Sequence, residues 1–160
     1  LTDDLSRKSE EDRLSCPIEA RKKAMDYLAR REHARAELIR KLTDKGFVRN
    51  IAEDAITKLA EDGLQSDERF AESFALSRLN QGKGPVRIRL DLKARGVDVA
   101  TIEFAIDELG ANWYELAREV RQRKFGLQAP DEFKERARQM RFLQYRGFEQ
   151  DHIQSAFAGD

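Results

Sequence analysis

The sequence has little cysteine, little proline and no long apolar run. Cys16 is the only cysteine in 160 residues, which excludes a disulfide framework and a cysteine-rich zinc site and is typical of a reducing compartment. No run of about 18 apolar residues occurs, so no membrane partner is expected. The first residues show no secretory signal pattern. With only 3 prolines and 9 glycines, the composition favours a helical protein with much solvated surface, and the lone cysteine favours a cytoplasmic one.

Net charge is also missing, since 30 basic residues balance 30 acidic ones. That balance alone argues against a nucleic-acid-binding protein, but the charges are segregated along the chain. Basic residues outnumber acidic ones by 9 to 4, 6 to 1 and 9 to 4 in the segments 21–47, 77–96 and 118–147. Acidic residues dominate between them, by 7 to 3 in 48–76 and 5 to 0 in 97–117. The local sign of the charge therefore matters more than the total.

A repeated pattern accompanies the alternating charge. Each of three copies has a glycine, a leucine four residues before it, an alanine nine residues after it and a bulky apolar residue at the next position. The glycines lie 50 and 51 residues apart. The matching positions are Leu42, Gly46, Ala55 and Ile56; Leu92, Gly96, Ala105 and Ile106; and Leu143, Gly147, Ala156 and Phe157. Matches at four offsets in all three copies indicate an internal repeat.

The helical spacing of apolar residues and the glycines that end the helices predict an all-α fold of about nine helices. Residues 1–16 lack apolar periodicity and are expected to form a loose, acidic arm. Three three-helix repeats should follow, at 17–63, 64–110 and 111–160. Because each repeat has too small an apolar stripe to bury alone, we expect the repeats to stack into an elongated, curved array with the basic helices along one side.

The middle copy has the densest positive charge. The turn 82–84 precedes Pro85, which suits the first position of a helix. We expect Arg78, Lys83 and Arg87 to converge near this helix N-terminus, which is itself a favourable anion site. The other candidate binding residues are basic positions of the same helix and of the flanking copies: Arg89, Lys93, Arg95, Arg35, Lys41, Lys45, Arg138, Arg141 and Arg146.

Each of these features also has a structural interpretation. The basic residues can solvate outer helix faces or pair with the acidic helices, and each such pair contributes little. The sequence Gly82-Lys83-Gly84 lacks the preceding strand of a phosphate loop and is typical of a helix-connecting turn. His33 and His152 have no ligand partner pattern and suit surface or capping positions, and Cys16 lacks a catalytic neighbour. No catalytic or metal-binding constellation is present, so we expect no enzyme and no cofactor.

The aromatic residues raise the same choice between packing and binding, because an exposed ring can stack on a nucleic-acid base. Core packing is the stronger interpretation for six of them, although Tyr145 and Phe148 border a turn where one of the two rings can be exposed. These six are Phe70, Phe74, Trp113, Phe133, Phe142 and Tyr145.

The segment 64–97 resembles the central signature of the RecX family, bacterial regulators of the RecA recombinase. The residues that carry the resemblance are Asp67, Arg69, Phe70, Ser77, Arg78, Gly82, Gly84, Pro85, Arg87, Ile88, Leu92 and Gly96. The segments 24–47 and 141–148 are similar to the first and third repeats of that family. One departure is Ala34, where the family often has a capping serine, and its loss weakens a helix cap by about 1 kcal/mol.

The resemblance implies a non-enzymatic inhibitor that lies in the groove of the RecA–single-stranded-DNA filament. Its partners would be the RecA filament, the single-stranded DNA within it and, more weakly, free DNA, and it would slow filament growth, ATP turnover and strand exchange during recombination and DNA repair. Nothing in the sequence requires a dimer, so a monomer is expected. Two other hypotheses remain: a nucleic-acid-binding repeat protein that acts on DNA directly, and a neutral scaffold for protein partners.

Overall fold

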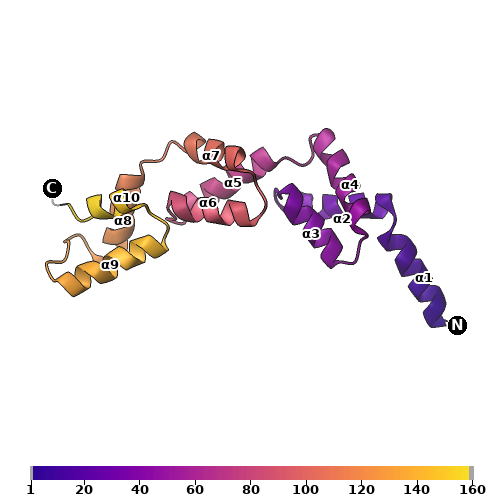
Figure 1. Cartoon of the computed structure of the whole chain (residues 1–160), viewed down its shortest axis with the longest axis horizontal. Helices are drawn as coiled ribbons and strands as arrows, with labels where there is room; N and C mark the ends of the chain where they lie inside the picture. The colour runs from indigo at the N-terminus through magenta and orange to yellow at the C-terminus, as the bar shows by residue number, and fades with distance from the viewer. Residues whose placement is uncertain (1, 159–160) are drawn as a thin grey trace. The chain divides into compact units, whose positions relative to one another are not determined.

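A computed structural model describes residues 2–158, and the described chain consists of α-helices joined by short turns, without a β-strand (Figure 1). The ten helices are α1 Thr2–Leu14, α2 Pro17–Arg30, α3 Arg35–Asp44, α4 Arg49–Glu61, α5 Asp67–Asn80, α6 Pro85–Ala94, α7 Val99–Glu108, α8 Trp113–Phe125, α9 Phe133–Tyr145 and α10 Gln150–Ser155. The all-α prediction is confirmed, and each of the nine expected helices has a counterpart. Over the described residues no helix has both the length and the apolar character needed to cross a membrane.

The chain divides into two compact units. The first contains the residues up to Phe70 together with the short segment Arg95–Val97. The second contains Ala71–Ala94 and the chain from Asp98 onward. Helix α5 starts in the first unit and continues in the second. Each unit has a hydrophobic core of its own.

In the first unit, α2, α3 and α4 pack against one another (Figure 1). Leu38 and Leu42 lie one turn apart on α3, so both side chains point to the same face and are fully buried. They meet Ile56 and Leu59 of α4, which lie three residues apart on one face of that helix and are also fully buried. Burying four such side chains contributes roughly 1.5–3 kcal/mol each, which holds α3 against α4, and Ala20 and Ala24 of α2 complete the same core.

The expectation of a loose arm at the N-terminus is wrong, because Thr2–Leu14 forms helix α1. No residue of α1 is buried, but its sequence lacks glycine and proline, has Asp3 and Asp4 in the first turn and pairs Glu10 with Arg13, all of which favour a helix. The end of α1 is attached to the first unit: the Val48 N–H donates to the Leu14 carbonyl over 3.1 Å, and the Leu14 side chain packs on the core. The lack of apolar periodicity in this segment therefore indicates exposed side chains, but it does not exclude a helix.

In the second unit, α6 packs on α7, and α8, α9 and α10 form a three-helix group (Figure 1). Leu92 of α6 and Leu143 of α9 are both fully buried, like Leu42 of the first unit. The repeated leucine therefore has a core position in all three copies. The core of the last group includes Ala117, Leu143 and Ile153.

One buried side chain of the second unit is charged. Arg121 of α8 is 2% exposed, and its guanidinium donates to the carbonyls of Ala156 over 2.9 Å and Leu127 over 3.2 Å. The guanidinium also lies 5.3 Å from the centre of the Phe157 ring. Burial lowers the pKa of Arg121, and repulsion from Arg118 adds to the effect. Arg121 thus ties the α8–α9 loop and the end of α10 to α8 through backbone carbonyls.

The repeated glycine follows the second helix of each copy and marks where neighbouring copies meet. Gly147 has φ 95° and packs directly against Arg87 and the backbone at Gly84, so that a Cβ at position 147 would collide with Arg87. In the first unit, Gly96 has φ 81°, and a Cβ there would lie 2.6 Å from the Cβ of Ala36. Both turns therefore need glycine for two reasons, the left-handed backbone and the close approach.

The packing prediction for six aromatic residues is partly wrong. Phe70 is buried, and Phe74, Trp113 and Phe142 are half-buried. Phe133 and Tyr145 are 82% and 70% exposed, because they stand at the two ends of α9, where no helix covers them. The Tyr145 ring instead lies below the Arg87 guanidinium, 5.8 Å from ring centre to carbon. Spacing alone does not show which helix ends lack a neighbour.

His33 and His152 are both buried, which excludes the surface position that the sequence allowed. The capping role is confirmed for His152, because its Nδ1 accepts the Glu149 N–H at the start of α10 over 3.2 Å. His33 donates from Nδ1 to the Arg31 carbonyl over 3.0 Å and accepts from the Lys41 ammonium at Nε2 over 2.9 Å. Burial lowers the pKa of His33 below its usual 6.5, and the neighbouring charges of Arg31 and Lys41 also lower it.

The buried His33 predicts a stability that depends on pH. Between the lowered folded pKa and the unfolded value of 6.5, the unfolded chain binds a proton that the folded protein does not. Stability contributed by neutral His33 is therefore complete above pH 6.5 and decreases as the pH falls below it. We expect the thermal midpoint, measured by circular dichroism, to be lower at pH 5.5 than at pH 7.5. His33→Gln should flatten the profile over this range, and an unchanged profile would contradict the assignment.

Candidate functional site

The turn that joins α5 to α6 carries the central part of the candidate site. Lys83 donates its N–H to the Arg78 carbonyl over 3.0 Å, which closes the turn at the end of α5. The N–H groups of Gly84 and Val86 donate to the carbonyls of Arg146 and Gly147, each over 2.9 Å. The third repeat thus already satisfies two N–H groups at the α6 N-terminus and Pro85 has none, so these three positions cannot contribute to the anion site that the sequence predicts.

Four cationic side chains gather beside this turn. Arg78 and Arg87 both reach the Asp91 carboxylate, with Nε–Oδ distances of 3.4 and 3.5 Å. Lys83 stands between α5 and α6, and Arg146 donates to the Gln81 carbonyl of the same turn over 3.1 Å. We call Arg78, Lys83, Arg87, Arg146 and Asp91 the junction cluster. It has four positive charges and one negative charge, so the expected convergence of the first three residues is confirmed.

The pKa of Lys83 shows that the positive charges of the junction cluster lie close together. The pKa of Lys83 is lowered, first by burial of its ammonium and then by repulsion from Arg146, Arg87 and Arg78, while Asp91 opposes the shift. Lys83 therefore interacts electrostatically with the other four members of the junction cluster. Binding of an anion to clustered like charges is favourable because the anion offsets their mutual repulsion. The junction cluster is suited to bind phosphate or carboxylate groups.

Aromatic rings hold the guanidinium groups of the cluster in place. Arg78 stacks on Phe74, with 4.4 Å between the guanidinium carbon and the ring centre. Arg146 lies 5.2 Å from the centre of the Phe142 ring. Each exposed cation–π contact contributes about 0.5–1 kcal/mol and restricts an otherwise flexible side chain. The cations are therefore partly preorganised for an incoming anion.

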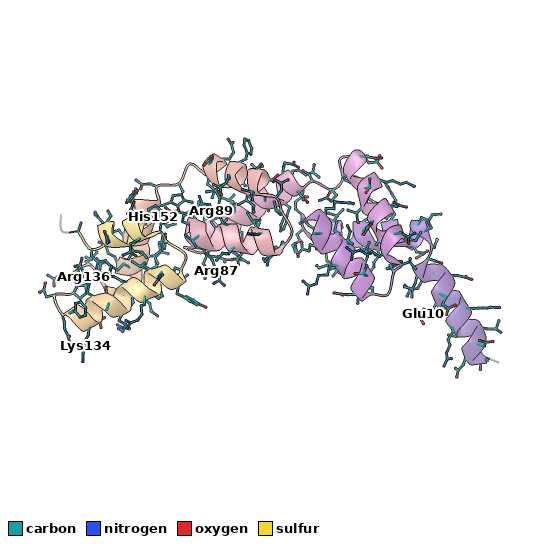
Figure 2. The ribbon with its side chains drawn as sticks, in the orientation of Figure 1. Glu10, Arg87, Arg89, Lys134, Arg136 and His152 are labelled. Carbon is teal, nitrogen blue, oxygen red and sulfur yellow. The ribbon has the colours of Figure 1, made fainter. Side chains whose placement is uncertain are left out.

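Arg89 belongs to a different environment from Arg87, although both are on α6. Residues two positions apart differ by about 200° around a helix, and Arg89 leaves α6 on the opposite side (Figure 2). Its guanidinium pairs with Glu103 at 2.7 Å and with Glu149 at 3.1 Å. These carboxylates raise the pKa of Arg89, chiefly through the hydrogen bond to Glu103. Arg89 thus links α6 to α7 and to the start of α10, as the structural interpretation of the basic residues expects.

The other predicted residues divide between the two units. In the first unit, Lys45 is exposed, Arg35 is partly buried, and Lys41 donates to His33 as described above. Arg95 also belongs to the first unit, at the turn that contains Gly96. In the second unit Lys93 and Arg141 are exposed, and Arg138 pairs with Glu135 at 2.7 Å. A continuous basic strip across all three repeats stays a prediction.

Sequence reasoning missed two components of the junction cluster. Asp91 is the one carboxylate on the basic helix and orients two arginines, and its position four residues after Arg87 was the available signal. Arg146 was assigned to the third repeat alone, because its arrival beside Lys83 depends on how the second and third repeats pack. Within the described residues no group of three or more His, Cys, Asp and Glu side chains is arranged to hold a metal ion.

Comparison with known families identifies the repeats. The three-helix domain models of RecX match residues 20–59 for the first domain, 66–106 for the second and 112–157 for the third. The chain belongs to the RecX family. The fold prediction of three three-helix repeats in tandem is thereby confirmed, and so is the resemblance drawn from the sequence.

Similar proteins agree with this assignment. The chain is 47% identical over 146 residues to the regulatory protein RecX of Pseudomonas syringae pathovar tomato, covering 91% of this chain and 94% of the relative. It is 44% identical over the same length and coverage to that of Pseudomonas putida strain W619. As a member of a family of regulatory proteins, the chain is a regulator and not an enzyme.

Solved structures of RecX proteins have the same fold. The crystal structure of RecX from Lactobacillus salivarius aligns with a TM-score of 0.72 at 22% identity, covering 88% of this chain and 93% of that one. A second crystal structure of the regulatory protein RecX aligns with a TM-score of 0.74 at 21% identity, covering 96% of this chain and 76% of that one. At this level of identity the likeness concerns the fold alone.

Proposed function

We propose that this RecX family member inhibits RecA by binding in the groove of the RecA–single-stranded-DNA filament. The observation that carries the proposal is the junction cluster, four cations around one carboxylate in the repeat that bears the family signature. A filament groove exposes DNA phosphates and acidic side chains, and arginine binds either oxyanion through two parallel hydrogen bonds. The protein acts as a monomer in the bacterial cytoplasm, where it slows ATP turnover, strand exchange and filament growth.

The proposed mechanism relies on several moderate contacts. A single exposed ion pair contributes about 0.2–1 kcal/mol, so one repeat alone cannot hold the protein on a filament. Repeats joined in one chain bind with a high effective concentration once the first has engaged. Basic positions in the second and third repeats, together with those of the first, therefore act jointly. An occupied groove resists the subunit movements that ATP turnover and strand exchange require.

The test is DNA-dependent ATP hydrolysis by preassembled RecA filaments with increasing amounts of this protein. We expect turnover to decline and to approach a plateau as the filament is saturated. Electron microscopy of the same samples should show shorter filaments. Unchanged ATP turnover at saturating protein would rule out the proposed inhibition.

A second candidate function is binding to DNA without RecA, which the excess positive charge of the junction cluster favours. Such binding depends on phosphate contacts and weakens steeply with added salt. We would distinguish the two functions by measuring binding to naked single-stranded DNA and to filaments between 50 and 200 mM salt. Tight binding to filaments with weak binding to naked DNA supports the inhibitor, and equal affinity for both supports the second function.

A further inference from the structure

A basic pocket of about 420 Å³ lies in the first unit, beside α3. Arg35, Arg40 and Thr43 line it from α3, Arg49 lines it from the start of α4, and Asp67 and Gly96 complete the wall. Three arginines that line one pocket repel one another, and a bound anion would offset that repulsion. Of the polar residues that line the pocket, the sequence predicts only Arg35 as a binding residue, and it does not indicate Arg40, Thr43 or Arg49.

The single carboxylate of the pocket is occupied by other groups. Asp67 Oδ1 accepts the backbone N–H of Arg35 over 2.8 Å and the side-chain amide of Gln65 over 2.9 Å. It thereby caps α3, where Ala34 has no side-chain oxygen to do so. These two hydrogen bonds engage Asp67 with neutral donors, so the pocket keeps an excess of positive charge.

The arginines of the pocket retain free donors. Arg35 Nη1 is the only buried side-chain nitrogen or oxygen within residues 2–158 that lacks a hydrogen-bond partner. Arg49 pairs through Nε with Glu53 at 2.8 Å, but that pair is exposed to solvent and uses one part of the guanidinium. Arg40 is exposed and makes no ion pair with any described residue. The guanidinium groups of Arg40 and Arg49 are exposed and can donate hydrogen bonds to an oxyanion that enters the pocket.

We propose that this pocket binds phosphate groups of single-stranded DNA. Three guanidinium groups and the Thr43 hydroxyl supply more donors than one carboxylate can accept. With Asp67 and with Glu53, which pairs with Arg49, the three arginines leave a net charge of +1, which suits a phosphate group. The volume falls within the range of about 300–1,000 Å³ for small-ligand sites, whereas Ala36 and Ile39 alone give little apolar surface for a peptide. The inference rests on the proposed function only in naming single-stranded DNA as the polyanion.

The test is fluorescence anisotropy of a labelled oligo-dT strand with the full chain between 25 and 150 mM salt. Arg40→Gln with Arg49→Gln removes two exposed guanidinium groups and should weaken binding about tenfold at low salt. The slope of log K against log salt should decrease by about 1.4, since each phosphate contact on a single strand contributes about 0.7. The matched control is Lys22→Gln with Arg30→Gln, which removes two exposed charges from α2 of the same unit.

Each outcome decides the proposal. Selective loss of DNA binding in the pocket variant supports it, and equal loss in the control overturns it because only net charge would matter. If the pocket variant binds oligo-dT normally but loses affinity for polyglutamate, the pocket recognises acidic protein segments and the proposal is wrong. Circular dichroism of both variants checks that the fold is intact. If the pocket variant binds oligo-dT as tightly as the unchanged protein and the protein still inhibits RecA, only the pocket proposal is wrong. If the pocket binds DNA but the protein does not inhibit RecA, only the proposed function is wrong.

Discussion

Gly147→Ala is expected to destabilise the second unit by about 2–5 kcal/mol. An alanine with φ near 95° strains the backbone by about 1–2 kcal/mol. Its Cβ also collides with Arg87, and such overpacking adds about 1–3 kcal/mol. The collision separates Gly84 and Val86 from the carbonyls of the third repeat. Urea unfolding followed by the fluorescence of Trp113, the only tryptophan, reports on this unit.

Gly126→Ala provides the matched control. Gly126 has φ 100°, but nothing lies within 4 Å of the place its Cβ would take. This variant therefore carries the backbone strain without the collision, and we expect a loss of about 1–2 kcal/mol. Equal losses in the two variants would show that the close approach at Gly147 contributes nothing to stability.

Lys83→Gln with Arg87→Gln should raise the concentration needed for half-inhibition of RecA by about 30-fold. The double variant lowers the charge of the junction cluster from +3 to +1, while Arg78 still pairs with Asp91. If each lost contact to an oxyanion contributes about 1 kcal/mol after screening by solvent, two contacts contribute about 2 kcal/mol. The measurement is filament ATP turnover as a function of added protein at fixed salt.

The control for this experiment is Lys134→Gln with Arg136→Gln. Both residues are exposed cations in the first part of α9 (Figure 2), and their replacement removes the same net charge from the same unit. We expect less than a threefold change for the control. Similar losses in both double variants would indicate attraction by net charge and would remove the special role of the junction cluster. Trp113 fluorescence and the unfolding curve identify any variant that fails to fold.

The repeat and its core could be predicted from the sequence because they depend on local spacing. A leucine four residues before a glycine places an apolar side chain in the last turns of a helix and a left-handed residue just after it. Leu42, Leu92 and Leu143 are fully buried, as this pattern predicts. The convergence of Arg78, Lys83 and Arg87 was predictable for the same reason, since all three flank one short turn.

Features that depend on packing between distant segments could not be predicted in this way. At the α6 N-terminus, the N–H groups of Gly84 and Val86 cannot bind an anion because carbonyls some 60 residues away in the chain accept them. His33 has a polar side chain and is buried only because Lys41 and the Arg31 carbonyl satisfy both ring nitrogens. Asp67 caps α3 across 32 residues of sequence, which compensates for the alanine at the usual cap position. Local composition contains no signal for such partners.

Imaging of this protein on a RecA–single-stranded-DNA filament by cryo-electron microscopy tests the central claim most directly. We predict density for the protein within the filament groove, with the turn between α5 and α6 facing the filament and Arg78, Lys83, Arg87 and Arg146 in contact with it. Density only outside the groove, or a bound protein whose junction cluster faces solvent, would contradict the account.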